Sequence, residues 1–327
     1  SAVFPTGATY DAGGLLQNAA ALDFSVWDAW VERWQGAANY CVFFSVGDAF
    51  EGEKAGTPRF NAMVASWLGA WVQHLAQQKI RPGQLVILLV DEPYDLKQDA
   101  VIVAWASAIR AACLGVKLFE DPTYADPSKG DPAMFAACDV LCPNTPMMLE
   151  QGDAFRAFYR RQHAAGKTLW LYSCSGPAKL LDPIAYHRAQ AWLAFQMGAE
   201  GSFYWAFGCG GGIGDSWHAY SQTGAEYSPY FVSPASVMEG KHSEAIRESA
   251  EDYEYLRMVR DAAGRETAKK PAAWQARAEA LLTEGVAEAV RSVSASNLFW
   301  QVEKDRSAMD TVRIRALDLL EEVSDSE

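Results

Sequence analysis

The sequence predicts an α/β protein that forms a (β/α)8 barrel of the TIM type, with a first strand that is atypical or absent, and ends in C-terminal helices. Three observations predict this class. Short runs of β-branched and aromatic residues alternate with amphipathic stretches of helical period. Several runs are apolar on both faces, as parallel strands covered by helices are. The length of 327 residues suits one barrel with additions. An open doubly wound sheet is the alternative fold.

The regular elements follow one another as strand, helix, strand. The predicted strands span residues 39–46, 85–90, 116–119, 139–142, 168–173 and 202–207. The helices between them span residues 62–78, 98–112, 150–165 and 184–197. The first of these helices carries an apolar stripe of helical period, formed by Val64, Trp67, Leu68, Trp71, Val72 and Leu75. A weaker candidate at residues 3–10 would be a seventh strand, whereas a closed barrel needs eight.

The chain changes character after the last predicted strand. Residues 208–230 are rich in glycine and aromatic residues, and the glycines do not match the G-x-G-x-x-G spacing of a dinucleotide site. Three helices are then predicted, at residues 243–263, 272–293 and 308–323. We therefore expect a barrel domain over residues 1–242, and C-terminal helices over residues 243–327 that pack on the barrel.

The composition favours a carbohydrate substrate over nucleic acid or membrane. Lys and Arg number 28 against 41 Asp and Glu, a formal net charge of −13, which repels phosphate backbones and anionic lipid. No apolar run approaches the roughly 18 residues of a membrane span. The 12 Trp, 13 Tyr and 15 Phe offer ring faces for sugars. The five His and six Cys lack the spacing of a metal site, so neither metal nor cofactor is expected.

Two adjacent carboxylates follow the most apolar predicted strand. In a helix-wrapped parallel barrel the active site lies at the C-terminal ends of the strands, and the strand 85–90 runs directly into Asp91, Glu92 and Pro93. Burying such a pair is costly unless the strand end lies in a polar cleft. Glycoside cleavage uses carboxyl groups of this kind. The alternative is that the pair only begins a turn or caps the next helix.

Other strand ends add an acid, an amide and aromatic rings. The candidate substrate-binding residues are Asp121, Asn144, Trp170, Tyr172 and Trp205, with Trp217 in the loop after the last strand. In the strand 168–173 the leucines suit the helix-facing side, which points Trp170 and Tyr172 into the barrel. Each candidate also has an ordinary structural interpretation, core filling for the aromatic residues and a turn for Asp121 and Asn144.

Several segments, in this order, resemble glycoside hydrolase family 123 and its relatives. They are the strand end Asp91-Glu92-Pro93, the segments 169–174 (LWLYSC) and 198–207 (GAEGSFYWAF), and the helix 243–256 (SEAIRESAEDYEYL). The similarity runs from about residue 22 to the C-terminus. Members of the family usually carry a β-sandwich domain ahead of the barrel, whereas here about 90 residues precede the acid pair.

The resemblance implies a retaining β-N-acetylgalactosaminidase-like enzyme that uses substrate-assisted catalysis. In this mechanism the 2-acetamido oxygen of the substrate attacks the anomeric carbon, so no enzyme nucleophile is needed. Carried onto this sequence, Glu92 is the general acid and then the base, and Asp91 holds the acetamido N–H. Tyr172 bonds the acetamido oxygen, and Trp205 forms the floor. Because polysaccharide-degrading relatives are exported, the resemblance also implies a secreted or periplasmic protein.

Two other functions stay open. A barrel glycosidase for another sugar would use double displacement, and would need a carboxylate nucleophile such as Asp121 or Glu226 about 5–5.5 Å from Glu92. A non-catalytic carbohydrate-binding barrel would bind sugars without turnover. The two enzymes differ in whether activity requires a 2-acetamido group.

Overall fold

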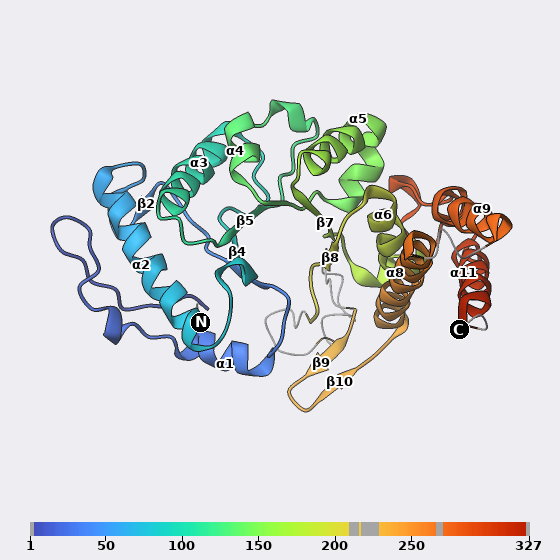
Figure 1. The fold of residues 1–327 in the computed structure, drawn as a ribbon, viewed down its shortest axis with the longest axis horizontal. Coiled ribbons are helices and arrows are strands. Elements are labelled where there is room, and N and C mark those ends of the chain that lie inside the picture. Colours follow the sequence, from blue (N-terminus) through green and yellow to red (C-terminus); the bar gives the residue numbers. More distant parts are fainter. Residues whose placement is uncertain (1–2, 209–215, 217–228, 266–270, 325–327) are drawn as a thin grey trace. The chain divides into compact units, whose positions relative to one another are not determined.

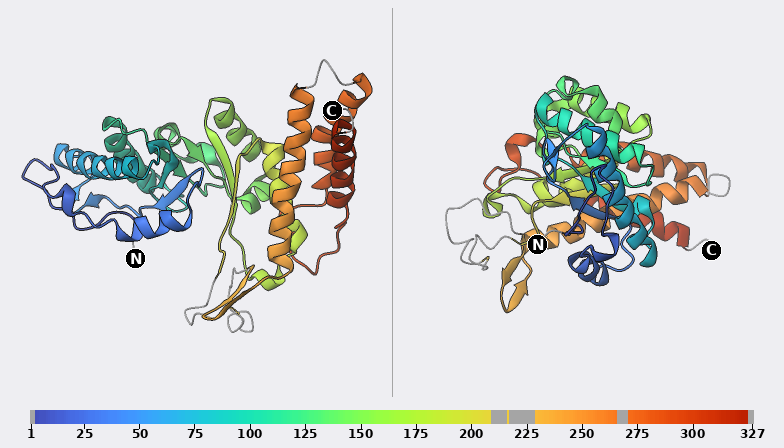
Figure 2. Two further views of the ribbon diagram at one scale, coloured as in Figure 1. Left: turned by 60° about the horizontal axis from the view of Figure 1, so that its bottom comes forward. Right: turned by 90° about the vertical axis from the view of Figure 1, so that its left-hand side faces the viewer.

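The chain folds as two units in the computed structural model, which describes residues 3–208, 216, 229–265 and 271–324. The first unit comprises Ser1–Cys142 and Ala164–Thr168, and the second comprises Pro143–His163 and Leu169–Glu327. Figure 1 shows the elements of both units in sequence colours, and Figure 2 gives two further views. The boundary expected at residue 242 lies inside the second unit, and the division into a barrel and C-terminal helices stays a prediction.

The first unit is built on four parallel strands. Their order is β1, β4, β5 and β6, which span Tyr40–Phe43, Leu85–Leu88, Lys117–Glu120 and Val140–Leu141. Every residue of β4 is buried, because this central strand has a neighbour on each side and is apolar on both faces. The parallel strands predicted at these positions are therefore confirmed, and the α/β class with them.

Helices flank these strands in the sequence. They are α1 (Ser25–Arg33), α2 (Pro58–Gln77), α3 (Leu96–Ala111) and α4 (Pro132–Ala137). Helix α2 begins at a Thr57 side chain that accepts the N–H of Phe60, with proline at the first helical position. Its predicted apolar stripe is buried except for the half-buried Val72, and α2 packs against α3 (Figure 1). Helices α1 and α4 are short and were not predicted from the sequence.

The strand expected at residues 3–10 is wrong. The segment makes only isolated antiparallel bridges, from Thr6 to Asp23 and from Tyr10 to Leu16. Pro5 has no N–H for a ladder, and Gly7 turns the chain at a φ of +83°. A small unpredicted hairpin of β2 (Ala49–Phe50) and β3 (Glu53–Lys54) follows β1.

The second unit contains a parallel pair and a group of helices. Strand β7 (Thr168–Ser173) pairs with β8 (Gly201–Tyr204), and an unpredicted antiparallel hairpin joins β9 (Phe231–Ser233) to β10 (Ser236–Met238). The α-helices are α5 (Thr145–Ala164), α6 (Ala189–Met197), α8 (Lys241–Arg265), α9 (Ala272–Ala280), α10 (Val286–Ala289) and α11 (Ala308–Ser324). Strand β8 ends before Trp205, earlier than predicted. No helix in the described ranges is long and apolar enough to cross a bilayer.

The three predicted C-terminal helices are confirmed. Helix α8 matches the first, and α11 matches the third. The second is divided into α9 and α10 by the π-helical turn Leu281–Gly285, and the residues on both sides of this turn keep helical φ and ψ angles. In Figure 2, α8 is a long helix that lies beside α11, and the two are in contact.

A buried arginine joins three helices of the second unit. The Arg188 guanidinium, 2% exposed, donates from Nε to Asp252 of α8 at 2.8 Å and from Nη1 to Asp310 of α11 at 2.6 Å. Trp192 of α6 also donates its indole N–H to Asp252 at 2.8 Å. Asp252 is the aspartate of the Glu-Asp-Tyr-Glu-Tyr run in the helix that carries the family resemblance. Its side chain therefore has a structural role, because it neutralises Arg188 where water is excluded.

Two buried histidines make the second unit sensitive to acid. The rings of His187 and His242 lie 5.5 Å apart, and no described group hydrogen-bonds their ring nitrogens. Burial lowers the pKa of His187 to about 3 and that of His242 to about 4, and the charge of Lys241 adds to the effect on His242. Both rings are therefore neutral in the folded protein at a pH where an unfolded histidine takes up a proton.

We expect the free energy of unfolding to fall as the pH drops below about 6.5, by up to about 1.4 kcal/mol per pH unit for each histidine. The sign follows because the depressed folded-state pKa lets only the unfolded chain bind the proton. The variant His187→Gln should lose stability less steeply between pH 7 and pH 5 in urea unfolding, and His163→Gln on α5 serves as the control. Equal slopes in wild type and His187→Gln would contradict the assignment.

Candidate active site

Four carboxyl groups gather at one edge of the first unit. Asp91 and Glu92 follow β4, and Glu120 ends the neighbouring strand β5 and precedes Asp121. Because parallel strands end at the same edge, the two pairs meet there. The backbone N–H of Glu92 donates to Asp121 Oδ1 at 2.9 Å, and that of Leu89 donates to Glu120 Oε1 at 3.2 Å. The predicted gathering of Asp91, Glu92 and Asp121 is thus present in the first unit.

The backbone turns sharply at Glu92. Its φ of +48° is a left-handed conformation, which is uncommon for a residue with a side chain and is kept only where the surroundings enforce it. Thr123 supplies such contacts, because its hydroxyl donates to the Glu92 carbonyl at 3.2 Å and its N–H donates to the Pro93 carbonyl at 2.9 Å. Because the strand ends at this turn, the side chains of Asp91 and Glu92 need not point to opposite faces of the sheet, as neighbouring residues of a continuing strand do.

The acid pair does not cap the next helix. Helix α3 has Asp95 at its N-cap, and this carboxylate accepts the N–H groups of Lys97 and Gln98. One structural alternative for Asp91 and Glu92 is therefore removed. The turn at Glu92 is real, and groups of the neighbouring loop, Asp121 and Thr123, stabilise it.

Burial changes the acidity of this cluster. Asp121 is 6% exposed, and loss of hydration raises its pKa to about 7, although the Glu92 N–H opposes the shift. Partial burial and the charge of Glu92 raise the pKa of Asp91, and a hydrogen bond with Asp121 opposes this rise. Burial, with the charge of Asp121, raises the pKa of Glu120 well above its usual range. The cluster therefore retains protons near neutral pH.

Backbone strain is concentrated at the same edge. Among the described residues, five that are not glycine have a positive φ. Two of them, Lys79 and Cys113, closely follow helices α2 and α3, where a left-handed residue commonly ends a helix. The other three, Ser45, Glu51 and Glu92, lie after β1, in the hairpin that follows β1, and after β4. Glu51 and Gly52 are the two central residues of the β2–β3 hairpin turn, where a positive φ is usual. Strain without a turn or helix end to explain it is therefore left at Ser45 and Glu92, and strain of this kind is typical of functional sites.

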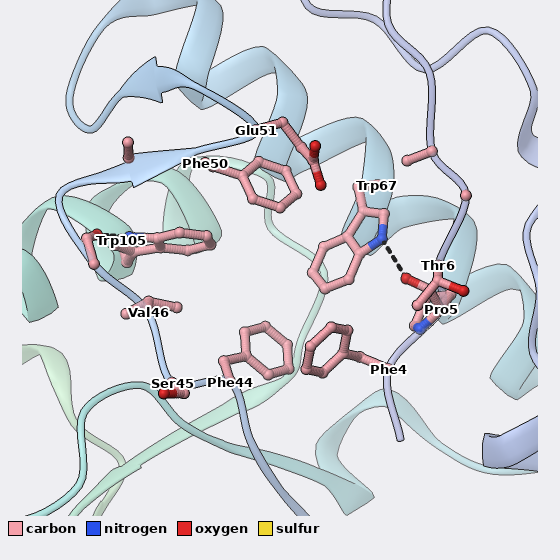
Figure 3. A pocket seen from close by; sticks show the side chains of 14 residues that line it. Phe4, Pro5, Thr6, Phe44, Ser45, Val46, Phe50, Glu51, Trp67 and Trp105 are labelled. Carbon is pink, nitrogen blue, oxygen red and sulfur yellow. Dashed lines mark hydrogen bonds between the residues drawn. The ribbon is translucent and has the colours of Figure 1, made fainter. Parts of the chain in front are cut away.

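An aromatic pocket of about 230 Å³ lies at the C-terminal end of β1 (Figure 3). The rings of Phe44, Phe50, Trp67 and Trp105 line it, and Glu51 supplies a carboxylate. These residues could not be recognised as a group in the sequence, because they come from the strand end, the hairpin and two helices. The only local signal was Phe44, near the end of the predicted strand 39–46.

The indoles of this pocket present apolar faces. The Trp67 N–H donates to the Pro5 carbonyl at 3.2 Å, drawn as a dashed line in Figure 3, and the Trp105 N–H donates to the Gly47 carbonyl at 2.9 Å. Their polar atoms are thus already paired, and the ring faces are left for packing. Both indoles are almost completely buried, 4% and 2% exposed, and they pack edge-on against neighbouring aromatic rings, as in an aromatic core.

The second unit places three predicted residues at neighbouring strand ends. Asn144 forms a parallel bridge with Tyr172, and the N–H of Trp205 donates to the Ser173 carbonyl at 3.0 Å, beside the end of β7. Tyr172 is 8% exposed, whereas Trp205 is 63% exposed. The Asn144 side-chain oxygen accepts the Met147 N–H at 3.0 Å, at the start of α5. Asn144 therefore has a structural role of the kind that was the alternative to substrate binding.

Trp170 packs inside the second unit. It is 5% exposed and contacts the ring of Phe203 on β8 at 5.1 Å. A Cβ atom at Gly201 would lie 2.5 Å from the indole, so glycine is required opposite Trp170. Trp170 therefore fills the core of the second unit, which was the alternative to substrate binding for this residue.

Trp217 lies outside the described residues, as does Glu226. Within the described ranges, no group of three or more His, Cys, Asp or Glu is arranged to hold a metal ion.

Comparison with known families identifies the chain. Residues 30–259, more than half of the sequence, match the family model of the glycoside hydrolase 123 catalytic domain. The chain belongs to glycoside hydrolase family 123. This match confirms the resemblance to family 123 that was inferred from the sequence. Because the matching model is that of a catalytic domain of glycoside hydrolases, the chain is a glycosidase domain. No curated protein matches it.

Solved structures of glycoside hydrolases also match the family 123 chain, one of them closely enough to show a similar fold. A family 123 glycoside hydrolase from Clostridium perfringens, studied for glycolipid glycan hydrolysis, has a TM-score of 0.55 at 12% identity, over 84% of this chain and 47% of that one. The chain thus spans about half the length of that enzyme. The endo-β-1,4-mannanase from Thermotoga petrophila has a TM-score of 0.35 at 12% identity, over 64% of each chain. The mannanase catalytic domain from Streptomyces sp. SirexAA-E has a TM-score of 0.31 at 17% identity, over 57% and 59%.

Proposed function

We propose that this family 123 chain hydrolyses β-linked N-acetylhexosaminides of the N-acetylgalactosamine type, with retention of configuration and substrate-assisted catalysis. The observation that carries the proposal is the carboxyl cluster after β4 and β5, where Asp91 and Glu92 stand side by side on a strained turn. Membership in a glycosidase family supplies the class of reaction, and the cluster supplies the acids that it needs.

In the proposed first step, the 2-acetamido oxygen of the substrate attacks the anomeric carbon while the bond to the leaving oxygen breaks. Glu92 gives its proton to that oxygen, and the sugar becomes an oxazolinium ion. Asp91, as a carboxylate, accepts the acetamido N–H and stabilises the positive charge. In the second step Glu92 removes a proton from water, which attacks the anomeric carbon and reopens the ring. Two inversions at one carbon give retention.

Other predicted residues have binding roles in this proposal. Tyr172 bonds the acetamido oxygen and Trp205 is the floor under the sugar ring, for which its exposed indole is suited. Asn144, Trp170 and Trp217 stay predicted contacts of the substrate. The complete (β/α)8 barrel and export from the cytoplasm also belong to the proposal, and the parallel strands of both units support the first.

Double displacement is the less favoured mechanism. It needs an ionised carboxylate at the anomeric carbon. Asp121 is 6% exposed, its Oδ1 accepts the Glu92 N–H, and burial raises its pKa to about 7. These properties suit a residue that holds its neighbours in place rather than one that attacks a sugar.

Hydrolysis of paired aryl β-glycosides tests the proposed function. Each sugar would be offered with a 2-acetamido group and with a 2-hydroxyl group. We expect turnover of the acetamido sugars only, with kcat/KM at least about a hundredfold above that of the hydroxyl sugars, because only the acetamido group supplies the internal nucleophile. Equal turnover of both sets would establish double displacement instead. Sugar binding without turnover would favour the binding protein.

A further inference from the structure

Asp121 contacts both members of the acid pair. Its Oδ1 accepts the backbone N–H of Glu92 at 2.9 Å, and its carboxyl group lies within hydrogen-bonding reach of the carboxyl group of Asp91. The residue is 6% exposed at the end of β5. One buried side chain therefore connects the backbone of the proposed acid to the side chain of the proposed acetamido ligand.

A hydrogen bond between two carboxyl groups requires a proton on one of them, because two carboxylates are both acceptors only. Asp121 is the more buried group, and burial raises its pKa to about 7, whereas the bond with Asp121 acts to lower the pKa of Asp91. The proton therefore resides on Asp121, and the carboxylate on Asp91.

We propose that Asp121 is a positioning residue of the proposed reaction, whose protonated carboxyl group donates to Asp91 while its other oxygen holds the turned backbone of Glu92. The inference rests on the proposed roles of Asp91 and Glu92. It differs from the substrate contact and from the nucleophile that the sequence suggested for Asp121. The proton that Asp121 donates keeps Asp91 ionised and holds its carboxylate in a fixed orientation. The bond from the Glu92 N–H to Asp121 fixes the backbone from which the Glu92 side chain extends.

Deprotonation of Asp121 removes this arrangement. The titratable groups that act with Asp121 are Asp91 and Glu92 after β4, Glu120 on β5 and Cys142 after β6. When Asp121 ionises, its bond to Asp91 is lost and the two carboxylates repel each other. We therefore expect an alkaline loss of activity that begins near pH 7 in the wild type.

Two substitutions separate positioning from the other roles. In Asp121→Asn the amide N–H₂ can donate to Asp91 and the carbonyl can accept from Glu92, without a titrating proton. We expect kcat/KM within about threefold of wild type at pH 6, and an alkaline limb at least one pH unit higher. Asp121→Leu keeps the number and branching of the side-chain heavy atoms but not the bonds, and should lower kcat about a hundredfold with little change in KM. Asp126→Asn, an exposed acid in the same loop, is the matched control.

Three results would overturn the proposal. An Asp121→Asn variant as inactive as Asp121→Leu would make the residue a nucleophile, and a raised KM with unchanged kcat in both would make it a sugar contact. If the alkaline limb of the kcat/KM profile stayed at the same pH in Asp121→Asn, the alkaline loss of activity would not come from a proton on Asp121. If the wild type turns over no glycoside, the proposed function fails by itself.

The proton can also be tested without activity. Because the folded-state pKa of Asp121 is raised, its contribution to stability is present below about pH 4 and is lost as the pH rises through about 7. Asp121→Asn should flatten this decline in the unfolding midpoint between pH 4 and pH 8, and Asp126→Asn should not. An unchanged decline would contradict the shared proton.

Discussion

Replacing Glu92 by Gln is expected to lower kcat about 10²- to 10⁴-fold, the range that one general acid–base group contributes. The amide has nearly the same shape as the carboxylic acid, but can neither protonate the leaving oxygen nor take a proton from water. Steady-state hydrolysis of a β-linked N-acetylhexosaminide would measure the effect. The loss should be largest for a sugar leaving group and smaller for a nitrophenyl group, which leaves without full protonation.

The control for this prediction is Glu150→Gln, at an exposed position of α5, which should leave kcat unchanged. Circular dichroism of Glu92→Gln would show whether the strained turn survives. If a folded Glu92→Gln variant kept more than a tenth of the wild-type kcat with both leaving groups, Glu92 would not be the general acid.

Replacing Asp252 by Ala is expected to cost about 3–5 kcal/mol of unfolding free energy, on the order of 10 °C in the melting temperature of the second unit. The side chain is fully buried, and it accepts from Arg188, Arg313 and the Trp192 indole. Its removal takes the acceptor from the Trp192 indole, and leaves Arg188 and Arg313 with only the more exposed carboxylates of Glu248, Asp310 and Glu251. Scanning calorimetry or urea unfolding at pH 7 would measure the loss.

Asp261→Ala is the matched control, because it removes another ion pair of the same helix. Asp261 pairs with the exposed Arg257 one turn away, and exposed pairs contribute about 0–1 kcal/mol. We expect the two variants to differ by at least about 2 kcal/mol. Equal losses in Asp252→Ala and Asp261→Ala would show that burial of the Arg188 pair does not govern its contribution.

The parallel strands and the C-terminal helices could be predicted because their signals are local. The apolar run at residues 85–90 and the apolar stripe at residues 62–78 show, from residue type and spacing alone, which side chains will be buried. The short helix α4 and the two hairpins gave no such signal, since elements of this length are decided by their neighbours. The segment at residues 3–10 resembled a strand, but Pro5 and Gly7 disrupt any ladder.

The candidate site was predictable in its position, but not in the roles of its residues. Asp91, Glu92 and Asp121 could be located because each follows closely on a predicted strand, and the carboxyl ends of parallel strands meet at one edge of the sheet. The hydrogen bond from Glu92 to Asp121 joins residues 29 apart, and spacing in the sequence carries no information about it. The aromatic pocket was missed for the same reason, as Phe44 and Trp105 are far apart in the chain.

By itself, the sequence determined the α/β class, the family and the strand end at which the acid pair lies. These depend on residue type and periodicity, which are properties of short segments. Only the tertiary structure decided that Asp121 is buried against Asp91 and Glu92, and that Asp252 neutralises Arg188. The physical reason is that the acidity of a carboxyl group and the cost of its burial depend on distance and desolvation in three dimensions. Neither quantity is encoded in the neighbours of a residue along the chain.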